Sequence, residues 1–246
     1  MIFFVTGGSR GIGEAIVLAA IRAGHDVAFT YVKAEKEASL VVEKARAIDP
    51  ARVARAYALD VRDSKRVDEV GERVLADFDT VDVVVCNAGV NQNGLAVSMS
   101  DEDWKLAIDT NLSGAFYVSR HFLPTFLANG RGRFIHISSI AQTGLSGQVN
   151  YGASKAGLIG LSGGLAKEYG KKGITSNVVV PGFFETDMTR ETMSQKHKDF
   201  WNTFCPVGRM GELEEMSSTV LFLASDGASF INGQTLHVTG GLDWSP

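Results

Sequence analysis

Short apolar segments alternate with longer amphipathic segments along the whole chain. The apolar segments are rich in Val, Ile and Phe and end in glycine or polar residues, as buried strands do. These predicted strands are residues 2–7, 26–32, 52–61, 82–89, 133–139, 175–182 and 234–241. Between them, apolar residues recur every three to four positions, which is typical of helices. The predicted helices are residues 11–24, 35–49, 63–78, 109–130, 151–173 and 212–226.

This alternation predicts parallel strands joined by crossover helices. The expected fold is therefore α/β, a Rossmann-type doubly wound parallel sheet of about seven strands flanked by helices. No linker or repeat interrupts the 246 residues, so residues 1–246 are predicted to form a single domain. The longest irregular segment, residues 183–211, is polar and aromatic. It is expected to be a lid over a substrate or a helical excursion packed on the surface.

Composition and charge then narrow the classes of function. The chain has a formal net charge of −4 and no basic block, which argues against nucleic-acid binding. Its two cysteines and five scattered histidines lack the spacing of a metal site, so no metal is expected. The first residues lack the features of a signal peptide, and no apolar stretch reaches transmembrane length. We therefore expect a cytoplasmic protein without membrane contact.

A glycine-rich segment, "VTGGSRGIG", ends the first predicted strand and opens the first predicted helix. Gly7, Gly11 and Gly13 allow a tight turn and a close approach of the backbone. The free N–H groups of a helix N-terminus bind the pyrophosphate of a dinucleotide in this context. No Gly-Lys-Ser/Thr follows, so the segment is not a P-loop. The alternative is that these glycines only form the turn.

The end of the second predicted strand indicates which dinucleotide. An NAD site usually carries an acid there to hold the ribose 2′-hydroxyl. This chain has Thr30 and Tyr31 at that place, with Arg10 in the glycine loop and Lys33 just beyond the strand. The missing acid and the nearby basic residues favour a 2′-phosphate and therefore NADPH. The alternative is that Arg10 and Lys33 are merely solvated.

The segment "NYGASKAGLIGLSGG" contains two patterns that can be catalytic. Tyr151 and Lys155 are spaced to lie one turn apart on a helix. The pKa of tyrosine must fall from about 10 to about 7 for proton exchange at neutral pH. A positive charge about 4 Å away supplies the ~4 kcal/mol required, and we expect Lys155 and an oxidised nicotinamide to contribute. The alternative for such a pair is an exposed helix surface.

The second pattern, "GLSGG", matches the G-x-S-x-G nucleophile elbow of acyl hydrolases, with Ser162 as the nucleophile. Asp226 and His237 follow in the required order. An elbow must follow a strand, however, and the residues before Ser162 have helical spacing. We therefore predict that Ser162 packs inside a helix, with the hydrolase as a remote alternative.

The chain resembles the classical short-chain dehydrogenase/reductase family. The resemblance rests on "TGGSRGIG", "LDV", "CNAG", "TNLSGAF", "ISSI", "YGASK" and "PGFFETDM", which occur in that order. It is most similar to the branch of 3-oxoacyl-carrier-protein and acetoacetyl-CoA reductases. The resemblance implies a catalytic tetrad of Asn111, Ser139, Tyr151 and Lys155. In it, tyrosine exchanges the proton, serine binds the carbonyl oxygen and asparagine positions a water that relays protons from the lysine.

The motifs and the resemblance together imply a set of cofactor-binding residues. The resemblance implies that Asp60 and Val61 hold the adenine end, and that Pro181, Gly182 and Thr186 hold the nicotinamide end. The set comprises Gly7, Ser9, Arg10, Gly11, Ile12, Gly13, Tyr31, Lys33, Asp60, Val61, Asn87, Ala88, Gly89, Tyr151, Lys155, Pro181, Gly182 and Thr186.

The chain departs from the family pattern in two places. Cys86 takes the first position of "CNAG" and is expected to be a small core residue. The loop from Ser139 to Tyr151 is one residue shorter than is usual in the reductase branch, and counting from Ser138 would restore the usual length. We choose Ser139 because the second serine of "ISS" acts in the family.

The resemblance implies an NADPH-dependent reductase of a 3-oxoacyl thioester in fatty acid or polyketide biosynthesis, with acyl carrier protein as a partner. The alternatives are a dehydrogenase of a small cyclic or secondary-metabolite alcohol and a dinucleotide-binding regulator without turnover. The family usually forms homotetramers, through helices that correspond here to residues 110–129 and 151–171. Candidate residues for docking an acidic carrier are Arg131, Arg133, Lys171 and Lys172.

Overall fold

The computed structural model describes residues 1–185 and 194–242, and they build one parallel sheet flanked by helices. The predicted seven strands and doubly wound α/β fold are confirmed. The strands are β1 (Ile2–Val5), β2 (Asp26–Tyr31), β3 (Ala54–Ala58), β4 (Val83–Cys86), β5 (Gly132–Ile137), β6 (Ile174–Pro181) and β7 (Thr235–Val238). Each is shorter than its predicted segment or equal to it in length, because the flanking glycine and polar residues form the turns.

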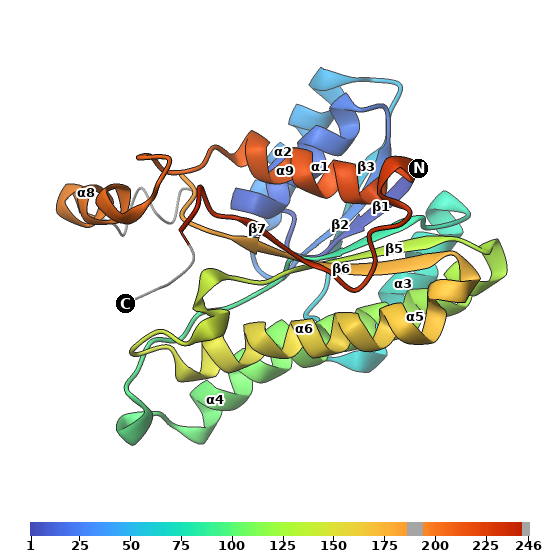
Figure 1. Ribbon diagram of the computed structural model, residues 1–246. Coiled ribbons are helices and arrows are strands. Elements are labelled where there is room, and N and C mark those ends of the chain that lie inside the picture. Colours follow the sequence, from blue (N-terminus) through green and yellow to red (C-terminus); the bar gives the residue numbers. More distant parts are fainter. Residues whose placement is uncertain (186–193, 243–246) are drawn as a thin grey trace.

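The strand order is β3-β2-β1-β4-β5-β6-β7, and every pairing is parallel. The chain leaves β1 toward β2 on one side and later returns to place β4 on the other side. Ligands of open α/β sheets bind at such a switch point, beyond the carboxyl ends of the strands. The carboxyl ends of β1 and β4 therefore mark where a binding site is expected, at the left of the sheet in Figure 1.

Helices cover both faces of the sheet (Figure 1). One face is covered by α1 (Gly11–Arg22), α2 (Glu35–Ile48) and α9 (Leu213–Ala224). The other face is covered by α3 (Ser64–Phe78), α5 (Gly114–Asn129) and α6 (Val149–Tyr169). Right-handed crossovers account for α1 and α2 on one face and for α3, α5 and α6 on the other, because the direction along the sheet reverses after β3. Helix α9 connects β6 to β7 but lies on the face of α1, so this last crossover has the opposite hand.

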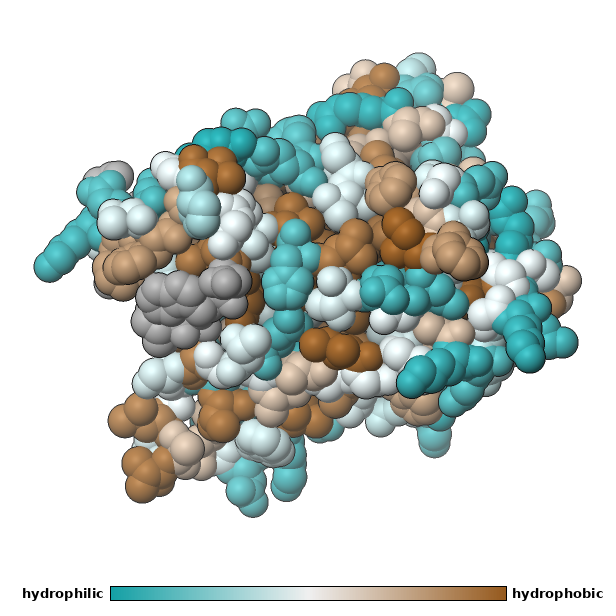
Figure 2. All heavy atoms as spheres, in the orientation of Figure 1, coloured by the Kyte–Doolittle hydropathy of each residue, from teal (hydrophilic) through white to brown (hydrophobic). Residues whose placement is uncertain are grey.

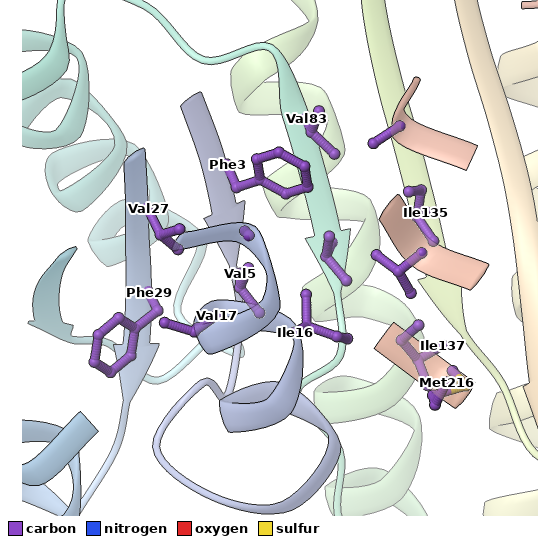
Figure 3. Close-up of a cluster of buried hydrophobic side chains, with 14 of the residues drawn as sticks. Phe3, Val5, Ile16, Val17, Val27, Phe29, Val83, Ile135, Ile137 and Met216 are labelled. Atoms are coloured by element: carbon purple, nitrogen blue, oxygen red, sulfur yellow. The ribbon is translucent and has the colours of Figure 1, made fainter. Parts of the chain in front are cut away.

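Alternation along each strand divides the core into two layers. Phe3 and Val5 of β1 pack under α1, α2 and α9, together with Val27 and Phe29 of β2 (Figure 3). Phe4 points to the other face and packs against the layer of α3 and α5. Both faces of the sheet are buried, so the strands are continuous apolar segments instead of alternating ones.

Between β4 and α5 the chain forms a second, shorter helix that the sequence did not predict. Helix α4 (Asp101–Ile108) begins at the N-cap Ser100, whose side chain accepts a hydrogen bond from the N–H of Asp103. A π-helical turn, Asp109–Ser113, then joins α4 to α5. Such turns are rare inside helices and frequently mark functional positions.

The segment predicted as a lid or a helical excursion contains a helix, α8 (Gln195–Phe204), beyond the end of β6. Trp201 of α8 stacks on Phe183, with ring centroids 4.1 Å apart, so the helix is held at the carboxyl edge of the sheet. Residues 186–193, within the predicted lid, lie outside the described part of the chain. Short 3-10 helices complete the fold at Ala96–Ser98, Ile140–Thr143, Gly170–Lys172 and Asp226–Ala228. In the described ranges, no helix combines the length and the apolar character needed to cross a membrane.

Candidate active site

The glycine loop after β1 is shaped by close backbone contacts. Gly7 has φ +66°, a conformation that glycine adopts without strain. A Cβ on Gly13 would lie 2.1 Å from the carbonyl oxygen of Gly7, so the first turn of α1 can pack on the loop only if residue 13 is glycine. The N–H of Gly7 donates to the hydroxyl of Thr30 at 3.2 Å. Thr30 therefore holds the loop from β2, where an NAD site would carry an acid.

The end of β4 is tied to the same loop. The side chain of Asn87 donates to the carbonyl oxygens of Thr6 and Gly7 at 3.1 Å and 3.0 Å. The hydroxyl of Thr6 accepts in return from the N–H groups of Asn87 and Ala88. The two strand ends that flank the switch point are thus held together by side chain to backbone hydrogen bonds.

A cleft of about 810 Å³ opens at this switch point, a volume within the range of small-molecule and cofactor sites. Arg10 is the N-cap residue of α1 and its side chain does not cap the helix, so the first N–H groups of α1 are available to an anion. The predicted residues that line the cleft are Gly7, Ser9, Arg10, Gly11, Ile12, Gly13, Tyr31, Lys33, Asp60, Val61, Asn87, Ala88, Gly89, Ser139, Tyr151, Pro181 and Gly182. Asn111 and Lys155 are buried behind this wall, and Thr186 lies outside the described residues.

The cleft carries opposite charges at the ends of β2 and β3. Arg10 and Lys33 line it as predicted, and Glu37 of α2 lines it as well. Asp60 forms a bidentate ion pair with Arg62, with 2.6 Å between the closest atoms. The hydrogen bonds from Arg62 hold the pKa of the Asp60 carboxyl below its usual value. Asp60 is therefore ionised and charge-neutralised at neutral pH.

Tyr151 and Ser139 meet at the carboxyl end of β5. Ser139 follows the strand and accepts a hydrogen bond from the N–H of Ala141, while Tyr151 lies in the first turn of α6. Burial raises the pKa of Tyr151, and a hydrogen bond with Ser139 opposes that rise. The pKa of Tyr151 is therefore raised overall, and our expectation that Lys155 lowers it is wrong.

The position of Lys155 explains this difference. Its ammonium group is buried and donates to the carbonyl oxygen of Ile137 at 2.7 Å, and it lies 5.6 Å from the centroid of the Tyr151 ring. Burial lowers the pKa of Lys155 to about 8. Tyr151 and Lys155 lie one helical turn apart as predicted, and the lysine donates its hydrogen bond to the end of β5.

Asn111 lies at the centre of the π-helical turn and is fully hydrogen-bonded. Its Oδ1 accepts from the N–H of Val90 at 2.8 Å, and its Nδ2 donates to the Val90 carbonyl and to Ser154 of α6. A Cβ on Gly89 would lie 3.3 Å from Asn111 Oδ1 and 3.4 Å from Lys155 Nζ. Asn111 thus connects the loop after β4 to the helix that carries Tyr151 and Lys155.

The two adjacent serines at the end of β5 have different surroundings. Ser138 is buried, and its hydroxyl lies 2.9 Å from both the Lys155 carbonyl and Gln142 Oε1. Ser139 faces the cleft and reaches Tyr151. The shortened loop after them begins with a 3-10 turn, Ile140–Thr143, and Ser139 is its N-cap.

Ser162 lies within α6, on the side of the helix that packs against the sheet. It is buried and its hydroxyl lies 2.9 Å from that of Ser176 in β6, which in turn lies 3.3 Å from Nε2 of His136. Asp226 forms an ion pair with Arg133 instead of a triad. Ser162 lies in the interior of a helix and does not line the cleft at the switch point, so the elbow pattern is a packing feature of the helix.

The residues predicted to dock a carrier lie together, but at the amino-terminal ends of the strands, opposite the cleft. Arg131 directly precedes β5, Arg133 is the second residue of that strand, and Lys171 and Lys172 precede β6, so all four lie at the amino ends of parallel strands. Arg133 is half-buried and donates to the carbonyl oxygen of Gly173 at 3.1 Å. The cleft opens at the carboxyl ends of the same strands, and these side chains therefore do not border it.

Sequence reasoning missed part of the cleft wall. Arg62 is adjacent to the predicted Asp60, and its charge could have identified it. Val90, Leu106 and Thr110 belong to the loop after β4 and to the unpredicted helix that follows. Phe183 follows Pro181 and Gly182 and brings an aromatic ring to the cleft. Val90 and Leu106 lie outside the family motifs, whereas Thr110 and Phe183 lie within "TNLSGAF" and "PGFFETDM" but were assigned no role.

Comparison with known proteins identifies the family. A family model described as enoyl-(acyl carrier protein) reductase matches residues 7–243. The chain belongs to the short-chain dehydrogenase/reductase family. A 3-oxoacyl-(acyl-carrier-protein) reductase of Salmonella typhimurium is 42% identical over 242 residues, which cover 98% of this chain and 96% of the relative.

Two further relatives carry the same name. The one from Escherichia coli is 41% identical over 242 residues, covering 98% of this chain and 96% of the relative. The one from Staphylococcus aureus is 40% identical over 241 residues, with 97% and 96% covered. Membership of this short-chain dehydrogenase/reductase family makes the chain an NAD(P)-dependent oxidoreductase that interconverts a ketone and an alcohol.

Proposed function

We propose that the protein reduces a 3-oxoacyl thioester to the 3-hydroxyacyl thioester with NADPH, and that Tyr151 donates the proton. The observation that carries the proposal is the meeting of Ser139 and Tyr151 in the cleft, next to a glycine loop and an uncapped helix N-terminus. The relatives named as 3-oxoacyl-(acyl-carrier-protein) reductases support the substrate class.

The cleft fits a dinucleotide because the glycine loop forms its floor. A side chain on that loop would fill the space that the pyrophosphate needs. Residues of the glycine loop and the free N–H groups of α1 would hold the pyrophosphate, Asp60 and Val61 the adenine end, and Pro181 with Gly182 the nicotinamide end. Thr186 remains part of this assignment. When bound, the nicotinamide supplies the hydride for reduction of the carbonyl carbon.

The side chains of this chain supply the rest of the chemistry. Ser139 donates a hydrogen bond to the carbonyl oxygen, whose negative charge grows during reduction. Tyr151 gives that oxygen its phenolic proton. The raised pKa of Tyr151 keeps the phenol protonated, which is the state that a proton donor requires. Lys155, with its pKa near 8, carries a proton that can replace the one given up.

The charges of the cleft support a preference for NADPH. Arg10 and Lys33 border it where β2 ends, and Thr30 is occupied with the glycine loop. A 2′-phosphate carries more negative charge than a 2′-hydroxyl and gains more from the two cations. The negative charge of Glu37 opposes binding of the 2′-phosphate. We expect the two positive charges of Arg10 and Lys33 to outweigh this effect.

The thioester would reach Tyr151 from the mouth of the cleft. Phe183, stacked on Trp201 of α8, forms an aromatic wall beside the predicted nicotinamide end. An acyl chain on a phosphopantetheine arm, attached to acyl carrier protein or coenzyme A, is thin and apolar enough to pass such a wall. A small cyclic or secondary-metabolite ketone is the alternative substrate.

A further proposal concerns assembly into a homotetramer. Phe116 of α5 and Ile159 of α6 are 42% and 40% exposed, on the helices predicted to pair. Phe222 of α9 is half-exposed, and Phe230 before β7 is fully exposed. Figure 2 shows apolar side chains among polar ones over α9 and the sheet edge below it. Two separate apolar faces are what a dimer of dimers requires.

A substrate and cofactor assay tests the proposed function. Purified protein is given acetoacetyl thioesters on acyl carrier protein or coenzyme A, a panel of small ketones, and crotonyl thioester as an enoyl substrate, each with NADPH or NADH. We expect the highest kcat/KM for the 3-oxoacyl thioester with NADPH. The enoyl substrate is included because the matching family model is described as an enoyl reductase.

Each outcome of this assay has a distinct meaning. A preference for small ketones would promote the alternative substrate class. Reduction of crotonyl thioester alone would mean that the site acts on a carbon–carbon double bond. A preference for NADH would contradict the assignment of Arg10 and Lys33.

A further inference from the structure

One hydroxyl in the wall of the cleft has no hydrogen-bond partner. Thr110 lies in the π-helical turn, is 9% exposed and lines the cleft. Among the residues that the structure describes, none forms a hydrogen bond with its Oγ1, which is itself buried. A helical threonine usually donates to the carbonyl oxygen four residues earlier, here Leu106. That carbonyl instead accepts the N–H of Asp109.

The neighbours of Thr110 show which part of the cleft it faces. Leu106, one turn earlier, also lines the cleft. Gly114, one turn later, packs so closely on Val61 that a Cβ there would lie 2.6 Å from Val61 Cγ2. Val61 follows β3 and lines the cleft beside Asp60. The row from Leu106 to Gly114 therefore runs along the cleft toward the end of β3.

This position and the unpaired hydroxyl together point to a ligand contact. A buried hydroxyl can donate one hydrogen bond and accept two, and leaving it unpaired is unfavourable. We propose that Thr110 Oγ1 forms a hydrogen bond with the adenosine half of the dinucleotide. The inference rests on the proposed function, since it assumes that the cleft binds NADPH with its adenine end near Asp60 and Val61.

The test compares variants that differ only at the hydroxyl. Thr110→Val keeps the shape and removes the hydroxyl, whereas Thr110→Ser keeps the hydroxyl. Dissociation constants are measured by titration calorimetry for NADPH and for adenosine 2′,5′-bisphosphate, a fragment without the nicotinamide. We expect Thr110→Val to weaken both by about tenfold, the effect of losing one hydrogen bond. Thr110→Ser should bind both nearly as the parent protein does.

A second measurement separates binding from a structural effect. Without ligand, Thr110→Val should unfold at the same temperature as the parent protein or a higher one, because an unpaired buried hydroxyl is replaced by a methyl group. Loss of affinity without loss of stability is the expected signature. Thr175→Val is the matched control, since Thr175 Oγ1 in β6 is also buried without a partner among the described residues but lies away from the cleft. It should leave both dissociation constants unchanged.

Three results would overturn the inference. They are unchanged binding by Thr110→Val, weaker binding of NADPH alone with the bisphosphate unaffected, and equal weakening by Thr110→Ser. If Thr110→Val does not fold, Thr110→Ala is measured in the same way. A parent protein that binds neither NADPH nor NADH would contradict the proposed function instead.

Discussion

Lys155 is the residue at which function and stability oppose each other. It is a buried ammonium group with one backbone acceptor, the carbonyl of Ile137, and burial lowers its pKa to about 8. A buried charge with so few partners destabilises the folded chain. Cys86 and His136 lie in the same buried layer; burial raises the pKa of Cys86 to about 12 and lowers that of His136 to about 4, so both are neutral at pH 7.

Replacing Lys155 is therefore expected to stabilise the protein and to abolish its activity. The folded pKa is about 8 and the ordinary value is 10.5, so the unfolded chain holds more protons between these values. The free energy of unfolding of the parent protein thus gains a contribution as the pH rises from about 8 to about 10.5. Lys155→Met lacks this contribution and should be more stable at pH 7, by up to about 3 kcal/mol.

The measurement is thermal or urea unfolding of both proteins between pH 7 and pH 10. The difference in stability should shrink as the pH rises. A difference in stability that stays constant across this range would show that folding does not lower the pKa of the Lys155 ammonium group.

Tyr151 and Ser162 give opposite expectations for activity. Tyr151→Phe removes the phenolic proton donor and should lower kcat by at least ~100-fold, while the affinity for NADPH changes little. Ser162→Ala should leave kcat within about twofold, because the hydroxyl bonds only within the core. Both variants are tested by steady-state kinetics with the thioester that gives the parent protein its highest kcat/KM. Loss of turnover in Ser162→Ala with retention in Tyr151→Phe would favour the hydrolase.

At the scale of elements, the turn from β1 into α1 holds the cofactor cradle. A Cβ on Gly13 would lie 2.1 Å from the Gly7 carbonyl oxygen and 2.7 Å from Asn87 Nδ2. Gly13→Ala is thus expected to displace the loop, to cost about 1–3 kcal/mol of stability and to weaken binding of NADPH. Unfolding and fluorescence titration measure the two effects.

Gly160→Ala is the control for this prediction. Gly160 is an exposed position of α6 where a Cβ would meet no atom within 4 Å. Alanine favours the helix by about 1 kcal/mol, so this variant should be slightly more stable and should bind NADPH normally. Normal binding by Gly13→Ala would show that the contact with Gly7 is not required for the cradle.

The π-helical turn between α4 and α5 has a role that becomes visible only in the packed structure. Its π-helical turn directs Asn111 toward Val90 and Ser154, and Thr110 toward the cleft. A regular helix through these residues would rotate the two side chains relative to α5. The sequence "DTNLSGAF" contains no signal for that irregularity.

At the scale of the molecule, the two apolar faces predict the oligomeric state. We expect a tetramer by light scattering after size-exclusion chromatography. Phe116→Asp places a charge on the α5 and α6 face, and Phe230→Asp places one beside β7; each should give dimers, and the double variant should give monomers. Leu40→Asp is the control, because Leu40 is exposed on α2, away from both faces. A monomeric parent protein would contradict the proposal.

The sequence alone determined the fold and most of the cleft. Apolar strands that alternate with amphipathic helices can bury both kinds of surface only as a parallel sheet between helices. Glycines at the end of the first strand, with small residues and asparagine after the fourth, mark a switch point because strand ends meet there whatever the details of packing. Local spacing likewise placed Tyr151 and Lys155 on one helix face.

Only the tertiary structure decided what depends on burial and on neighbours distant in the chain. The direction of the Tyr151 pKa shift follows from its burial and from Ser139, not from the spacing to Lys155. The roles of Ser138 and Ser139 differ because one faces α6 and the other faces the cleft. The basic residues at the amino ends of β5 and β6 are remote from the cleft, because the cleft opens beyond the carboxyl ends of the same parallel strands. Thr110 acquires a candidate role in the same way, since an unpaired hydroxyl is a property of the packed chain that residue identity does not encode.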